Sequence, residues 1–174
     1  MTYRMLAVRL VVAVLTVSGS AGRVSARPAA QGDVQAGIAL YDNGKYAEAE
    51  AALRGNADLV AKAYFAASLA KQKKHVEAEL VAKEVLESRP ADEVALAALG
   101  NALLGQDKTD EAIERLTAAI QVQPKLAYAY YWRGQAYNNK KKVSSMASDF
   151  QMFLRLAPNA PEAKLVQAVL AGLR

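Results

Sequence analysis

Residues 90–124 read PADEVALAALGNALLGQDKTDEAIERLTAAIQVQP, and the residues that follow repeat the same pattern. Pro124 and Pro158 are 34 residues apart, and Gly100 and Gly134 keep that spacing. A fixed period of this length indicates a structural unit that cannot bury its apolar face alone and must stack on its neighbours. The repeat therefore determines the architecture of the chain and the kind of surface that it presents.

Each period contains two helices. Apolar residues recur every three or four positions in both halves, which favours helices over the alternation typical of strands. Asp92 precedes the first helix as an N-cap, and Thr109 opens the second helix with acidic residues in its first turn. The proline that ends the period cannot continue a helix, so it separates one unit from the next. The two apolar stripes are Leu96, Leu99 and Leu103, and then Ile113, Leu116 and Ile120.

This pattern resembles the tetratricopeptide repeat (TPR), which places small residues where two helices cross closely. Numbered from the first residue of its first helix, unit two begins at Leu59, unit three at Glu93 and unit four at Ala127. Unit one is in register from Ala30, but its second helix is cut short near Gly55. Unit three matches the family pattern at Leu96, Leu99, Gly100, Leu103, Ala112, Leu116, Ala119 and Pro124.

The resemblance implies an all-α fold, a right-handed helical-repeat solenoid of about four helix–turn–helix units that occupies residues 34–158. Unit four departs from the family pattern, with Arg133 at position 7. We expect residues 159–174 to form a capping helix, because the end of a solenoid must be covered. In this helix Asn159 is the expected N-cap, with Glu162 as its N3 partner and Pro161 in the first turn.

The first 26 residues have the layout of a secretory signal peptide. Arg4 and Arg9 precede an apolar run over residues 10–17, and small residues follow up to Ala26. This run is too short to span a membrane, although an uncleaved N-terminal anchor is the alternative. We therefore expect an exported protein, periplasmic or secreted, in which residues 27–33 are a short linker.

The basic charge of the chain comes mostly from this leader. The full chain carries a formal charge of +5, but residues 1–26 hold three arginines and no acidic residue. The remaining 19 basic and 17 acidic side chains leave only +2. Because the net charge after cleavage is so small, it does not favour nucleic acid as a partner.

The residue inventory argues against catalysis. The chain has no cysteine, which excludes disulfides and thiolate chemistry, and His75 is its only histidine. His75 lies at the start of a second helix, where packing explains it better than a role as ligand or general base. Acidic pairs such as Asp110 and Glu111 fit helix first turns. We therefore expect no catalytic residues, no metal site, no cofactor and no small-molecule substrate.

The resemblance implies that the first helix of each unit lines a concave groove. The groove-facing positions combine small apolar residues with tyrosines and carboxamides, a mixture that suits an extended peptide or an amphipathic helix. For Tyr128 and Tyr131, packing between helices is the alternative role. The expected groove residues are Val60, Ala63, Ala67, Val94, Ala97, Asn101, Tyr128, Tyr131, Trp132, Gln135 and Asn138.

A second surface is suggested by lysines at position 16 of every unit. These are Lys45, Lys74, Lys108 and Lys142, reinforced by Lys71, Lys73, Lys140 and Lys141. Stacking aligns the turns along one edge, where several charges together could meet anionic lipid or an acidic partner. Solvated polar turns are the simpler explanation.

The main hypothesis is a non-catalytic scaffold that binds a protein or peptide of the cell envelope. An electrostatic adaptor that uses the lysines at a membrane surface or on an acidic partner is the alternative.

The leader generates the first testable prediction. Mass spectrometry of the chain expressed in an exporting host should find an N-terminus at Arg27 or Gly22, after Ala26 or Ala21. A cytoplasmic form that keeps Met1 would contradict export.

Overall fold

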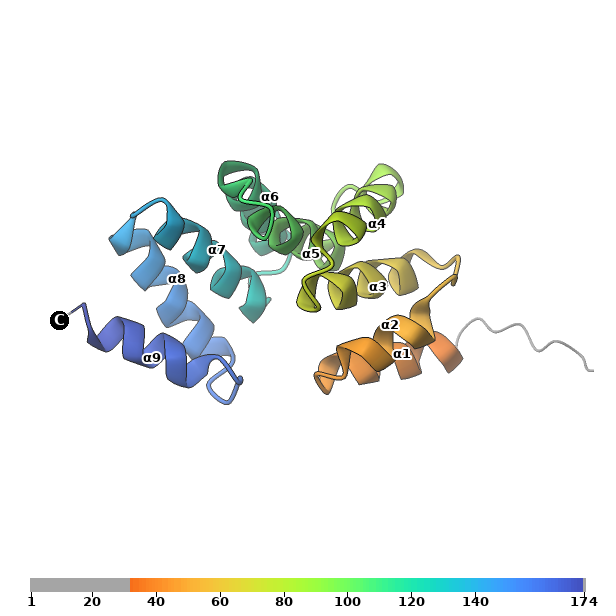
Figure 1. The fold of residues 1–174 in the computed structure, drawn as a ribbon, viewed down its shortest axis with the longest axis horizontal. Helices are drawn as coiled ribbons and strands as arrows, with labels where there is room; N and C mark the ends of the chain where they lie inside the picture. Colours follow the sequence, from red (N-terminus) through yellow and green to blue (C-terminus); the bar gives the residue numbers. More distant parts are fainter. Residues whose placement is uncertain (1–31, 174) are drawn as a thin grey trace, which may run out of the picture.

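The computed structural model describes residues 32–173, and its helices pair into stacked units (Figure 1). The expected signal peptide and most of the expected linker lie outside the described residues. The helices are α1 (Gly32–Asp42), α2 (Tyr46–Leu53), α3 (Leu59–Lys71), α4 (His75–Ser88), α5 (Glu93–Leu104), α6 (Thr109–Val122), α7 (Ala127–Asn139), α8 (Val143–Leu156) and α9 (Ala163–Ala171). None of these helices is both long and apolar enough to cross a membrane.

The helix pairs stack in chain order. In units one to three, the first helix packs against its own second helix and against the first helix of the next unit, as α3 does with α4 and α5. Each second helix also packs against the following first helix. The pairs fan out along an arc, so that α1 and α9 lie at the two ends of its open side (Figure 1). This arrangement confirms the expected all-α solenoid.

The repeat starts agree with the sequence register. Helices α3, α5 and α7 begin at Leu59, Glu93 and Ala127. The Asp92 carboxylate accepts a hydrogen bond from Ala95 N at 2.8 Å, which confirms its role as an N-cap. Unit one is shortened in its second helix, because α2 has eight residues and α4 has fourteen.

The stacking depends on close contacts at the registered glycines. A Cβ atom on Gly100 would lie 2.4 Å from Leu116 Cγ, and one on Gly134 would lie 2.6 Å from the Phe150 ring. Leu116 is fully buried, so it has little room to move. In units three and four, where a large residue of the second helix fills this space, the two helices can approach so closely only because the first helix carries glycine there.

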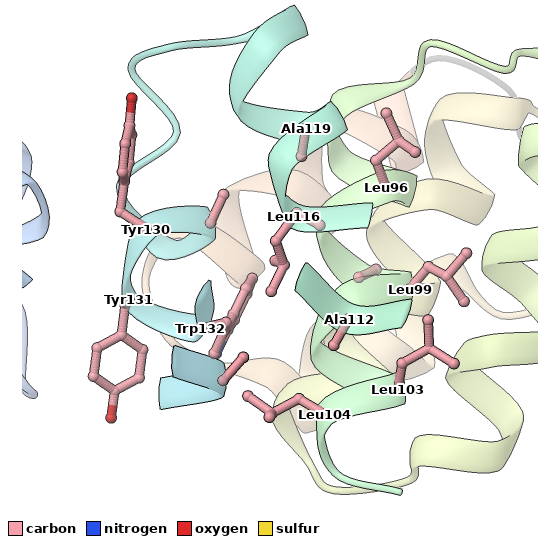
Figure 2. Packing of buried hydrophobic residues seen from close by; sticks show 14 of the residues in the cluster. Leu96, Leu99, Leu103, Leu104, Ala112, Leu116, Ala119, Tyr130, Tyr131 and Trp132 are labelled. Atoms are coloured by element: carbon pink, nitrogen blue, oxygen red, sulfur yellow. The ribbon is translucent and has the colours of Figure 1, made fainter. Parts of the chain in front are cut away.

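The buried apolar residues form a core that extends along the stack of units and is not gathered around one centre. In Figure 2, Leu99 and Leu103 of α5 point away from α7, whereas Trp132 of α7 lies on the side that faces α5. Tyr131 points the opposite way, toward the α8 rings Phe150 and Phe153, with a ring-centre distance of 5.0 Å to Phe153. Packing between helices therefore accounts for the burial of Tyr131.

The turn inside each unit has the same backbone in all four units. Position 15 adopts a positive φ of 57–75°, at Gly44, Lys73, Asp107 and Lys141. A side chain is strained in this region, so units two to four accept a cost that glycine avoids in unit one. The following lysine of every unit is then the N-cap residue of the second helix.

The departure at Arg133 has a structural cause. Its guanidinium makes two 2.8 Å bonds to the Asp149 carboxylate and donates to Thr117 Oγ1 at 3.0 Å. These contacts join α7 to α8 and to α6 of the preceding unit. A bidentate ion pair therefore replaces the apolar contact that the family pattern places there.

The expected capping of the last helix is wrong in detail. Helix α9 begins at Ala163 with Glu162 as its N-cap residue, and no side chain caps it. Asn159 and Pro161 lie in the preceding turn. Because a residue before proline is disfavoured in the helical conformation, Ala160 blocks an earlier start.

Helix α9 keeps the register of a first helix. Ala163 is at the position of the buried alanines Ala61, Ala95 and Ala129, and is itself buried. Val166 is buried against the core, whereas Leu165 and Val169 are exposed. Helix α9 is therefore the first helix of a fifth unit that has no second helix among the described residues.

The glycine contacts predict a test of the stacking. Gly100→Ala should lower the free energy of unfolding by about 1–3 kcal/mol, because overpacking against Leu116 outweighs the better helix propensity of alanine. Gly172→Ala is the matched control, since a Cβ there meets only carbonyl oxygens at 3.6 Å or more. Urea unfolding followed by circular dichroism measures both. Equal stability of the two variants would contradict the role given to Gly100.

Candidate functional site

The concave face holds an apolar cavity of about 540 Å³. Its floor consists of small residues on the first helices of units two and three, and its walls are aromatic. One end is closed by the α1–α2 turn and the other by Pro161 of the α8–α9 turn. The residues that line it are Tyr41, Asp42, Asn43, Gly44, Tyr46, Tyr64, Ala67, Val94, Ala97, Ala98, Leu126, Tyr128, Trp132 and Pro161.

A second cavity of about 570 Å³ continues the groove and is more polar. It shares Gly44, Tyr46, Trp132 and Pro161 with the first cavity, and adds the amides of Asn101 and Gln135. Lys71, Lys73 and Glu162 supply its charges. The two cavities meet at the residues that they share, and these charged side chains line only the second cavity.

Lys71 lies near these shared residues, among aromatic rings. Its ammonium is 3.7 Å from the centre of the Tyr128 ring, 5.1 Å from that of Tyr46 and 5.6 Å from that of Trp132. These distances are typical of cation–π contacts. The side chain is only 9% exposed, and burial lowers the pKa of Lys71 although Glu162 opposes this effect.

The α8–α9 turn reaches the same point from the far end of the chain. The Glu162 carboxylate lies 3.4 Å from Lys71 Nζ and accepts a hydrogen bond from Tyr128 Oη at 2.8 Å. Burial and the neighbouring Glu162 charge raise the pKa of Tyr128, so its hydroxyl stays protonated and donates. The chain therefore places a carboxylate of its own inside the groove.

The structure brings seven of the expected groove residues to the two cavities and places four elsewhere. The seven are Ala67, Val94, Ala97, Asn101, Tyr128, Trp132 and Gln135. Val60 packs against the α1–α2 pair, and Ala63 is buried against Val85 and Ala95, so neither lines the groove. Tyr131 packs on α8, and Asn138 is exposed beyond the second cavity. The binding role of the seven stays a prediction.

Sequence reasoning did not find the residues that close the groove. Tyr46 begins a second helix, and Glu162 was expected to cap α9. They reach the groove because the arc brings the α1–α2 turn and the α8–α9 turn toward each other (Figure 1). The 34-residue period carries no signal for this curvature.

The lysine edge is largely paired within the chain. Lys74 Nζ lies 2.7 Å from the Glu50 carboxylate, and Lys108 Nζ lies 3.0 Å from that of Glu79. Lys45 pairs with exposed Glu48 at 3.3 Å, and Lys142 Nζ is 6.0 Å from the centre of the Tyr137 ring. Lys71 belongs to the groove and not to this edge.

The two buried glutamates form a repeated contact between units. Glu50 and Glu79 occupy position 21 of units one and two, and each accepts a 2.7 Å bond from the Gln at position 14 of the next unit. Lys83, Lys108 and Gln106 donate to the Glu79 carboxylate and lower its pKa to about 2. Hydrogen bonds from Lys74 and Gln72 lower the pKa of Glu50. Lys74 and Lys108, the position-16 lysines of units two and three, therefore join neighbouring units.

His75 has a packing environment. Its ring lies against Gly105, where a Cβ would be 2.2 Å from Nε2. Its Nδ1 is buried without a hydrogen-bond partner among residues 32–173. Burial and the nearby Lys73 lower its pKa, which keeps the ring neutral. Within the described part of the chain, no cluster of three metal-ligating side chains is present.

Known proteins share this fold. A family model described as TPR repeat matches residues 100–140. Residues 41 to the end of MamA from Desulfovibrio magneticus RS-1 are 26% identical, with a TM-score of 0.55 over 74% of this chain and 76% of that one. The thermophilic TPR protein TTC0263 of Thermus thermophilus is 20% identical, with a TM-score of 0.65 over 79% of each chain.

The fold is also found in the Yersinia enterocolitica type III secretion translocator chaperone SycD. That chain is 16% identical, with a TM-score of 0.54 over 66% of this chain and 87% of that one. The search of curated proteins found no match.

Helix pairs stacked around a concave groove define a helical-repeat scaffold for protein–protein interaction, a class that is in general non-catalytic. A family model for the TPR repeat matches residues 100–140, and the superpositions show that the described helices have the fold of tetratricopeptide repeat proteins.

The Glu79 contacts predict how stability depends on pH. Because the folded-state pKa of Glu79 lies below the ordinary value of 4.5, its contribution is present above pH 4.5 and is lost as the pH falls toward 2. Glu79→Gln should lower the free energy of unfolding at pH 7 by about 1–3 kcal/mol. The difference from the original chain should shrink between pH 4.5 and pH 2.

Glu77→Gln on the exposed face of the same helix is the control, and should change stability little at any pH. Urea unfolding at a series of pH values measures all three chains. A difference for Glu79→Gln that does not vary with pH would contradict the assignment.

Proposed function

We propose that the chain is a non-catalytic scaffold that binds a peptide or helical segment of a partner protein in its concave groove. The observation that carries the proposal is the pair of connected cavities, which measure about 540 and 570 Å³ on the face formed by the first helices. Cavities of this size accept several side chains and not a whole domain. The partner therefore presents a segment.

The lining sets the chemistry of that segment. Ala67, Val94 and Ala97 leave room for apolar side chains, and Tyr128 and Trp132 offer large contact areas at a low entropy cost. Asn101 and Gln135 can donate to and accept from a peptide backbone. A partner segment matches both cavities if it places an apolar side chain in the first cavity and a polar stretch of its backbone in the second.

The electrostatic adaptor is the weaker candidate. Lys74 and Lys108 already have carboxylate partners within the chain, so much of their charge is neutralised before any ligand arrives. Export to the cell envelope, which rests on the leader sequence, is part of the proposal. The partner is then an envelope protein.

The groove proposal predicts the effect of filling the first cavity. Ala97→Phe should abolish capture of the partner from an envelope extract, because the ring occupies the space that the segment needs. Ala52→Phe, at an exposed position of α2, is the matched control and should capture the partner normally. Immobilised variants of equal helical content are compared by quantitative mass spectrometry of the bound proteins.

Salt separates the two candidates. Groove binding should change little between about 0.1 and 0.5 M salt, whereas binding at a lysine edge should weaken strongly. If capture survives Ala97→Phe but is lost on changing Lys74, Lys108 and Lys142 to Gln, the electrostatic adaptor replaces the groove scaffold.

A further inference from the structure

The Glu162 carboxylate occupies a site that has the features of a ligand site. Lys71 Nζ and Tyr128 Oη both face it, at 3.4 and 2.8 Å. These two groups come from α3, which contributes to the floor of the groove, and from α7, whose aromatic side chains form part of its wall. Glu162 itself comes from the α8–α9 turn, which closes one end of the groove.

Helix α9, which follows the α8–α9 turn, is packed against fewer helices than α3 and α7 are. Among the described helices, α9 packs only against α8, whereas α3 packs against four helices and α7 against three. When a segment enters the groove, the α8–α9 turn is therefore the element that gives way, and it takes Glu162 with it.

Departure of Glu162 leaves a charge without its partner. The Lys71 side chain is buried among three aromatic rings, which attract its ammonium but do not neutralise it. A buried cation without a counter-charge is costly. A segment that supplies a carboxylate at this point removes that cost, and an uncharged segment does not.

We propose that Glu162 is an internal stand-in for an acidic side chain of the partner, which binds to Lys71 and Tyr128 when the α8–α9 turn is displaced. This inference rests on the proposed function, because it assumes that the partner enters the groove. It specifies the partner segment as one with a Glu or Asp beside its apolar residues.

The probe for this proposal is the chain's own segment supplied as a separate peptide. The peptide APNAPEAKLVQAVLA, residues 157–171, is compared with versions that carry Gln or Lys at the position of Glu162. Trp132 is the single tryptophan of the chain and lines both cavities, so its fluorescence reports occupancy. The receptor is the full chain with Glu162→Gln, in which the internal carboxylate is missing.

We expect the Glu peptide to bind this receptor about tenfold more tightly than the Gln peptide, as one charge-assisted hydrogen bond allows. The unchanged chain should bind the Glu peptide about tenfold more weakly, because its own carboxylate competes. Lys71→Met, added to the receptor, should remove the preference between peptides, and Lys71→Arg should restore it. Circular dichroism verifies that each variant is folded.

Equal binding of the Glu and Gln peptides, or no fluorescence change with either at millimolar concentration, overturns the inference. Tightest binding of the Lys peptide also overturns it, and shows that the aromatic rings accept a partner's ammonium. Ala97→Phe in the receptor separates the two proposals. Peptide binding that survives this change lies outside the groove and counts against the proposed function. Binding that is lost, without a Glu preference in the parent receptor, refutes only the inference.

Discussion

The absence of a side chain at Gly100 and Gly134 is the constraint on which the rest of this structure depends. Each glycine lets a large residue of the second helix, Leu116 or Phe150, fill the space between the two helices of a unit. That spacing is repeated from unit to unit, with buried alanines such as Ala95 and Ala129 maintaining it between units. The groove results from this spacing, because small residues on one side of the stack let the stack curve toward that side.

The period of 34 residues was sufficient to predict the helices and most of the groove floor. Three of the four first helices begin where the register puts them, because packing at the small positions leaves little freedom. The start of α9 was not predictable in the same way, since two local rules compete there. Asn159 favours a helix start, whereas Pro161 disfavours the helical conformation of the residue before it.

The candidate site was predictable only where it consists of repeated positions. The groove contains Ala67, Ala97 and Asn101, because each of them occupies a repeat position that faces the groove in the family pattern. Tyr46 and Glu162 reach it through the curvature of the whole stack, which is a sum of small rotations that no single motif encodes. The regular spacing of the lysines did not reveal their partners within the chain. The glutamates at position 21 of the preceding units bind two of these lysines, Lys74 and Lys108.

The contact between Lys71 and Glu162 changes the connectivity of the fold as well as its groove. In an open array of repeats each unit meets only its neighbours, so disorder at one end spreads inward one interface at a time. Here residues 91 positions apart in sequence touch, which links the second unit to the turn before α9. The contact closes the units from the second to the fourth into a ring, so we expect loosening of α9 to affect α3 directly. Cooperativity would then depend on this closing contact as well as on the interfaces between neighbouring units.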